Sequence, residues 1–186
     1  PLFAELAGGR PWVVIWAAGH ASTSTPQGEA FKELDALQLL VNAVKQYPPS
    51  GTGTFFVTSS AGGIYAGSEN PPFTSDSSPH PLSPYGELKL RQEELVSQQL
   101  GERTRVIIGR LSNLYGPGQN LGKLQGLISQ LVVSSITKVP LKMFVSLDTL
   151  RDYIYTDDAA QIILSLVTGP NWKPGVGTQV IASGQP

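Results

Sequence analysis

The chain has 186 residues, of which 40% are hydrophobic and 15% charged, a balance typical of one globular domain rather than a disordered segment. A net charge of −1 shows no electrostatic footprint for nucleic acid, and the absence of cysteine excludes disulfides and thiolate metal sites. No apolar run approaches the ~20 residues of a membrane helix, so we expect no membrane or nucleic-acid partner and a cytoplasmic location.

Apolar runs and helical periodicities alternate along the chain and are separated by turn-forming residues. The predicted elements, in chain order, are a strand at 11–16, a helix at about 29–46, a strand at 54–59, a turn at 60–63, a Pro- and Ser-rich loop at 70–84, a helix from 84 that Gly101 stops, a strand at 104–111, a turn at 113–120, a helix at 124–133, short strands at 143–145 and 153–155, a helix that Asp157 caps, and a strand at 180–182.

This alternation of strands and helices predicts an α/β fold with a parallel sheet and right-handed crossovers. In such sheets ligands bind beyond the carboxyl ends of the strands. Three predicted strands end in small or polar residues, namely Ala17-Ala18-Gly19, Ser59-Ser60 and Leu111-Ser112-Asn113. We therefore expect a ligand site where these three ends meet.

The stretch from Ser83 to Lys89 combines a helix start with two ionisable side chains. Ser83 is a suitable N-cap and Pro84 suits the first helical turn. Tyr85 and Lys89 are four residues apart, so they share one face of the helix. A neighbouring ammonium lowers the pKa of a phenol and makes it a usable base. Taken alone, the same spacing also describes an ordinary pair on the surface of an amphipathic helix.

Five segments, in order, carry a resemblance to a known family. The chain is similar to extended short-chain dehydrogenases/reductases of the NAD-dependent epimerase/dehydratase type, which act on nucleotide sugars. Ser83–Lys89 matches the Ser-Pro-Tyr-x-x-x-Lys motif of that family. The other four matching segments are Val14–Gly19, Thr58–Tyr65, Gly109–Gln119 and Arg151–Ala159.

The resemblance implies a Rossmann-like sheet with flanking helices and a set of roles. Tyr85 would be the acid/base, and Lys89 would hold the nicotinamide ribose and lower the pKa of Tyr85. Ser60 would hydrogen-bond the reacting oxygen, with Ser59 as its rival. The remaining contacts implied are Ala17, Ala18, Gly19, Ser59 and Leu111 for NAD or NADP, and Asn113 and Arg151 for the nucleotide-sugar substrate.

Several of these residues have simpler alternatives. Either serine can cap a turn, and Asn113 can be a turn residue with unusual backbone angles. Arg151 can instead pair with Asp152 or Asp157. The adjacent carboxylates Asp157 and Asp158 fit a helix N-cap better than a metal or acid/base pair.

The two histidines offer little chemistry. His20 follows a strand end and suits either the cofactor pocket or a solvated loop, and His80 has no assigned role. Two distant histidines without thiols give no transition-metal site.

The family's Gly-x-x-Gly-x-x-Gly phosphate loop is absent from the sequence. The resemblance therefore implies a fragment, with a partial Rossmann domain at 1–112, and substrate-lobe segments mixed with the last Rossmann strand and helix at 113–186. We expect these residues alone to bind a dinucleotide weakly, and the strand at 13–16 to have a bare apolar edge.

Three functions follow from these considerations. We predict an epimerase or dehydratase of nucleoside-diphosphate sugars, with an NADPH-dependent carbonyl reductase or a non-catalytic binding module as alternatives. The family likeness also implies a homodimer.

Overall fold

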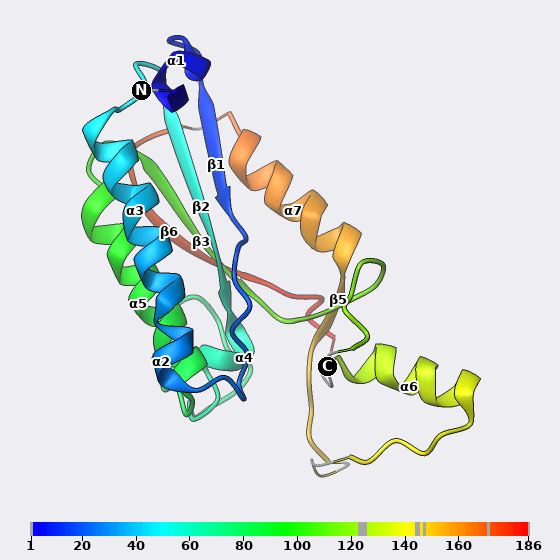
Figure 1. The fold of residues 1–186 in the computed structure, drawn as a ribbon. Helices are drawn as coiled ribbons and strands as arrows, with labels where there is room; N and C mark the ends of the chain where they lie inside the picture. Colours follow the sequence, from blue (N-terminus) through cyan, green and yellow to red (C-terminus); the bar gives the residue numbers. More distant parts are fainter. Residues whose placement is uncertain (1, 123–125, 144–145, 147, 171, 186) are drawn as a thin grey trace.

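A computed structural model describes residues 2–122, 126–143, 146, 148–170 and 172–185. Its helices and strands are arranged as Figure 1 shows. They are α1 (Leu2–Ala7), β1 (Trp12–Trp16), α2 (Gln27–Ala30), α3 (Lys32–Gln46), β2 (Gly53–Ser60), α4 (Ala61–Ile64), α5 (Pro84–Leu100), β3 (Arg105–Leu111), β4 (Asn113–Tyr115), α6 (Leu127–Thr137), β5 (Tyr153–Tyr155), α7 (Thr156–Thr168) and β6 (Gly175–Ile181).

The strands form two parallel sheets, and the prediction of a Rossmann-like α/β fold is confirmed. The larger sheet has the order β1-β2-β3-β6, and every neighbouring pair is parallel. The smaller one pairs β4 with β5, with Asn113 opposite Tyr153. Because β1, β2 and β3 are parallel, their carboxyl ends lie at one edge of the sheet, where the ligand site is expected.

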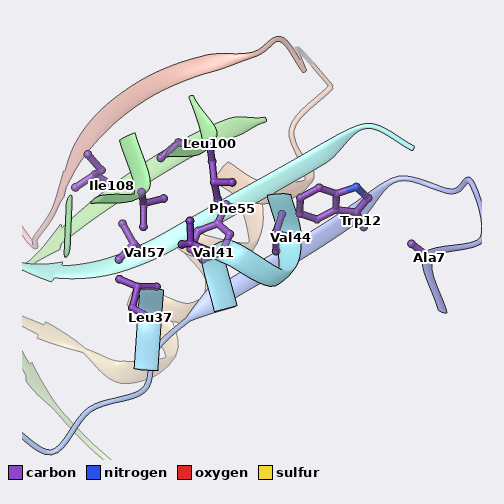
Figure 2. Packing of buried hydrophobic residues seen from close by; sticks show 11 residues of the cluster. Ala7, Trp12, Leu37, Val41, Val44, Phe55, Val57, Leu100 and Ile108 are labelled. Carbon is purple, nitrogen blue, oxygen red and sulfur yellow. The ribbon is translucent and has the colours of Figure 1, made fainter. Parts of the chain in front are cut away.

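Helices cover both faces of the larger sheet (Figure 1). One core lies between the sheet and the pair α3 and α5, where Leu37 and Val41 of α3 meet Phe55 and Val57 of β2 (Figure 2). A second core lies on the α7 side, where Val167 packs near Phe56, Ile107 and Ile181. Long apolar runs such as β2 are therefore buried on both faces, as parallel strands require.

Strand β1 is an edge of the larger sheet, as expected from the sequence. Trp12 packs into the core under α3, and Val14 and Trp16 lie against it. Val13 and Ile15 point to the opposite face and are 42% and 47% exposed. The predicted bare apolar edge is therefore present in this structure.

Some predicted elements differ from those observed. The helix at 29–46 is two helices, because Phe31 separates α2 from α3. The turn at 60–63 is the short helix α4, whose N-cap is Ser60. Residues Asn113–Tyr115 form β4 rather than a turn, because they pair with β5.

The second half of the chain brings further corrections. Asp157 does not cap α7, since Tyr155 is the N-cap and both Asp157 and Asp158 lie in the first turn, where a carboxylate still favours the helix dipole. Residues 144–145 of the strand predicted at 143–145, and residues 124–125 of the helix predicted at 124–133, lie outside the described residues, and Met143 is in no strand. Helix α6 is shifted to 127–137 and has no buried residue.

None of the helices in the described ranges combines the length and apolarity needed to traverse a lipid bilayer. The division of the chain at residue 112 stays a prediction.

Candidate active site

Helix α5 positions Tyr85 and Lys89 beside the end of β2. Its N-cap is Ser83, whose Oγ accepts a hydrogen bond from the backbone N–H of Gly86 at 3.2 Å, and Pro84 occupies the first turn. This start, predicted from the sequence, fixes which face of the helix carries the two side chains. The Lys89 Nζ lies 5.7 Å from the centre of the Tyr85 ring.

The Lys89 ammonium is buried and bonded to the sheet. Its Nζ donates to the carbonyl oxygen of Thr58 at 3.3 Å and to Oε1 of Gln92 at 3.1 Å. Burial lowers the pKa of Lys89, while the charges of Glu33 and Glu93 oppose that shift. The amine is therefore held in one place with two oxygen partners.

Ser59 and Ser60 lie on opposite faces of β2, since successive side chains alternate along a strand. The Ser60 Oγ accepts from the backbone N–H of Gly63 at 3.1 Å and lies close enough to the Tyr85 side chain to lower the pKa of that phenol. The Ser59 Oγ donates to Oε1 of Glu93 at 2.5 Å and is buried. The structure thus brings Ser60 together with Tyr85, and Ser59 together with a buried carboxylate.

Two glycines allow this close approach between α4 and α5. A Cβ on Gly63 would lie 3.0 Å from the Tyr85 ring, and a Cβ on Gly86 would lie 2.3 Å from the carbonyl oxygen of Gly63. Neither position accommodates a larger residue without moving Tyr85 away from Ser60.

The Tyr85 phenol differs from the sequence expectation. Burial raises its pKa, the Ser60 hydroxyl lowers it, and the charge of Glu33 raises it further, so the net pKa lies above the ordinary value. The expectation that Lys89 lowers the pKa of Tyr85 is therefore not met in this structure. The reason is that burial penalises the charged phenolate, and the negative charge of Glu33 penalises it further.

The strand ends beside this cluster are small or exposed. Ala17, Ala18 and Gly19 follow β1 and are exposed, whereas Leu111 at the end of β3 is buried. Exposed small residues next to a buried amine and a phenol fit the nicotinamide end of a dinucleotide, because they let a ring and a ribose approach the backbone. Leu111 packs in the core on the α7 side.

Glu93 and Arg110 form a buried ion pair behind the cluster, which sequence reasoning missed. The Arg110 Nη2 lies 2.7 Å from Oε2 of Glu93, and its Nε donates to Oε1 at 3.1 Å. Arg110 Nη1 also donates to the Tyr65 hydroxyl at 2.5 Å, and that hydroxyl donates to the carbonyl of Thr74 at 2.7 Å. Glu93 is one turn beyond Lys89 on α5, so the pair ties this helix to β3.

Glu33 is a second residue that the sequence did not single out. It lies in the first turn of α3, where an acidic residue usually signals only a favourable helix dipole. In the fold its carboxylate accepts hydrogen bonds from backbone N–H groups of His20 and Ala21, just beyond Gly19. The local sequence carries no signal for this contact, because it depends on which residues the fold brings together.

The two predicted substrate residues lie apart from the cluster. Asn113 is exposed, and its Nδ2 donates to the carbonyl oxygen of Asp152 at 2.9 Å. Arg151 is exposed, and within the described ranges it forms no ion pair with Asp152 or Asp157. Neither Asn113 nor Arg151 hydrogen-bonds to Tyr85, Lys89 or Ser60 in the described part of the chain.

Asp152 itself is bonded to the chain after β6. Its carboxylate accepts from the backbone N–H of Ser183 at 2.9 Å and of Gly184 at 2.7 Å, and from the Ser183 hydroxyl at 2.9 Å. Burial alone would raise the pKa of Asp152, but the Ser112 hydroxyl and the hydrogen bonds from Ser183 and Gly184 outweigh it and lower the pKa.

The described residues contain no group of three or more His, Cys, Asp or Glu side chains that could bind a metal ion. The backbone of His80 pairs with Ile64 and Gly67, and His20 lies in the exposed loop after β1.

Comparison with known proteins identifies relatives. Residues 5–181 match the model of the NAD dependent epimerase/dehydratase family. The chain is 30% identical over 111 residues to dTDP-4-dehydro-6-deoxyglucose reductase from Escherichia coli, which covers 58% of this chain and 34% of the relative. It is 33% identical over 89 residues to dTDP-L-rhamnose 4-epimerase from Burkholderia thailandensis, covering 47% of this chain and 24% of the relative.

Solved structures agree in fold. MoeE5 in complex with UDP-glucuronic acid and NAD superposes with a TM-score of 0.79 at 26% identity, covering 93% of this chain and 57% of that protein. The chain spans between about a quarter and three fifths of the lengths of these relatives.

Proposed function

This chain belongs to the NAD-dependent epimerase/dehydratase family, and from that membership we propose an activity for the full-length protein. It epimerises or dehydrates a nucleoside-diphosphate sugar with NAD or NADP, and Tyr85 is its acid/base. The observation that carries this proposal is the meeting of three groups, the Tyr85 phenol, the Lys89 amine and the Ser60 hydroxyl, at the carboxyl end of β2.

Tyr85, Ser60 and Lys89 have different proposed roles in the reaction. Bound NAD supplies a hydride acceptor, a reaction that belongs to the cofactor. Tyr85 exchanges the proton of the sugar hydroxyl, and the Ser60 hydroxyl bonds the same oxygen. The raised pKa of Tyr85 keeps its proton near neutral pH, the form that donates to a carbonyl oxygen. Lys89 would hold the ribose of the cofactor, and the exposed residues Ala17–Gly19 would contact it.

The predicted residues outside this cluster take secondary roles. Ser60 is preferred over Ser59, because the hydroxyl of Ser59 is committed to the buried Glu93. Asn113 and the exposed Arg151 are proposed to contact the substrate, since an arginine fork suits a diphosphate. The homodimer and the cytoplasmic location stay predictions.

A carbonyl reductase is the second candidate. The supporting observation is the similarity to a dTDP-4-dehydro-6-deoxyglucose reductase over more than half of this chain. The two activities differ in cofactor balance, because a reductase consumes one NAD(P)H per turnover whereas an epimerase regenerates its cofactor. Measuring NAD(P)H absorbance during turnover of a dTDP- or UDP-sugar separates them.

The test of the acid/base role is Tyr85→Phe in the full-length protein. Loss of a general acid/base lowers the rate by roughly 10²- to 10⁴-fold. We expect kcat to fall by that amount while cofactor affinity, measured by calorimetry, stays near the wild-type value. Ser59→Ala is the matched control for Ser60→Ala, and only Ser60→Ala should lower kcat substantially.

Unchanged turnover in Tyr85→Phe would remove Tyr85 from the mechanism. A wild-type protein that binds neither NAD(P) nor UDP- and dTDP-sugars would instead support the third possibility, a scaffold that keeps the fold without the chemistry.

A further inference from the structure

One carboxylate beside the cluster has no part in the proposed reaction. Glu33 is half-buried in the first turn of α3, and a single oxygen, Oε1, accepts hydrogen bonds from the backbone N–H groups of both His20 and Ala21, the second at 2.6 Å. These two residues directly follow the Ala17–Gly19 turn. The carboxylate therefore fastens the loop beyond β1 to helix α3.

The loop lies tightly against this carboxylate. Gly19 has a φ of 146°, in the region that favours glycine, and a Cβ at this position would lie 2.6 Å from Oε2 of Glu33. Both oxygens of Glu33 thus face the chain between residues 19 and 21. The sequence segment assigned to the cofactor turn is shaped from behind by a side chain of another element.

The same charge reaches the cluster. Glu33 interacts electrostatically with Tyr85 and with Lys89, both on α5. The other groups facing these two are the Ser60 hydroxyl from the end of β2, the Thr58 carbonyl of β2, and Glu93 of α5 on Lys89.

Two more ionisable groups lie near Glu33. Arg91 of α5 lies 5.0 Å from the centre of the Phe31 ring, just before α3, and the His20 side chain lies on the fastened loop itself. In any test that changes the charge of residue 33, Arg91 and His20 must therefore remain unchanged.

We infer that Glu33 is a positioning residue of this site, which holds the loop after β1 in place and sets a negative charge beside Tyr85 and Lys89. The inference rests on the proposed function, in that the loop carries the cofactor contacts and Tyr85 the proton. It adds a residue whose oxygen orders the loop and whose charge favours a protonated phenol.

Two substitutions separate these contributions. Glu33→Gln keeps an oxygen at Oε1, which can still accept both backbone hydrogen bonds, but removes the charge. Glu33→Ala removes both. Glu29→Gln, on the exposed surface of α2, is the control for a loss of charge near the same loop.

The effect of the Glu33 charge is measured from the pH dependence of kcat/KM and of the Tyr85 absorbance. The negative charge of Glu33 raises the pKa of Tyr85, so its removal lowers that pKa. In Glu33→Gln we expect the alkaline limb of the kcat/KM profile, where the proton-donating form of Tyr85 is lost, to move to lower pH. The ultraviolet titration of the one tyrosinate signal that is missing in Tyr85→Phe should move in the same direction.

The ordering of the loop after β1 is measured by amide hydrogen exchange and by cofactor affinity. In Glu33→Ala the amides of His20 and Ala21 should exchange roughly 10- to 100-fold faster, the effect of losing a hydrogen bond to a charged group, and the KM for NAD(P) should rise. In Glu33→Gln both should remain within about twofold of wild type, on the scale of a neutral hydrogen bond that is kept.

Unchanged exchange in Glu33→Ala would overturn the ordering role, and a Glu33→Gln titration that superposes on that of wild type would overturn the charge role. Exchange and titration need no turnover, so they decide the role of Glu33 even if Tyr85→Phe disproves the proposed reaction.

Discussion

The sheet half of the chain and the segment between β4 and β5 differ in how they hold their side chains. In the sheet half, Leu37, Phe55 and Val57 are fully buried between the strands and α3 and α5 (Figure 2). Between β4 and β5, helix α6 has no buried residue and lies away from the larger sheet (Figure 1). Ile136 and Leu150, on either side of residue 143, are 75% and 77% exposed.

The difference in packing coincides with a difference in proposed roles. The groups proposed for proton transfer lie in the sheet half, where Lys89 is buried and the buried Glu93–Arg110 ion pair lies behind it. The residues assigned to the substrate, Asn113 and Arg151, flank the exposed segment. The proposed acid–base residues thus lie in the well-packed half, and the proposed substrate residues lie beside the segment with the least packing of its own.

Among the variants that test this difference between the two regions, we expect loss of the buried Glu93–Arg110 ion pair to lower the free energy of unfolding most. Removing one partner of such a pair costs about 3–5 kcal/mol, because the other charge stays buried without compensation. Glu93→Ala should therefore lower the free energy of unfolding by that amount, measured by urea denaturation. Glu94→Ala, the exposed neighbour on the same helix, is the control and should stay within about 0.5 kcal/mol. Equal effects of the two variants would contradict the assigned burial.

A matched pair of leucines tests packing in the two regions directly. Leu37 of α3 is fully buried, whereas Leu131 of α6 is 47% exposed. Leu37→Ala should cost about 2–5 kcal/mol through lost contacts and a cavity, while Leu131→Ala should stay within about 0.5 kcal/mol. A large loss for Leu131→Ala would show that α6 is packed in the full-length protein, for instance against a partner subunit.

The smallest of these effects concerns the α4–α5 contact. A Cβ on Gly86 would lie 2.3 Å from the carbonyl oxygen of Gly63, whereas a Cβ on Gly62 meets nothing within 4 Å. Gly86→Ala should lower the free energy of unfolding by about 1–3 kcal/mol and reduce kcat, because α5 must move away from Ser60. Gly62→Ala should be neutral in both assays.

The sequence was sufficient for the elements with strong local signals. Strands β1, β2 and β3 are apolar runs, and α5 starts at the predicted cap and ends before Gly101. Strand β4 was missed because Asn113–Tyr115 is short and polar at its start, and its stability comes from pairing with residues forty positions later. Such a pairing leaves no periodicity in the local sequence.

The site shows the same limit. Tyr85 and Lys89 share a helix face, and their spacing alone reveals this. Which of Ser59 and Ser60 faces them depends on the orientation of β2, and adjacent serines do not reveal it. Glu33 and Glu93 read as ordinary helix acids until the fold places them against a loop and an arginine.

The bonds of Asp152 bear on how this protein can change over evolution. They join the end of β6 to β5, and Asn113 at the start of β4 donates to the Asp152 carbonyl, so both ends of the exposed segment are anchored at one point. For a flexible loop with fixed ends, doubling the length costs only about 0.6 kcal/mol of closure entropy. Insertions and deletions in this segment should therefore cost little stability and leave the packed sheet half unchanged.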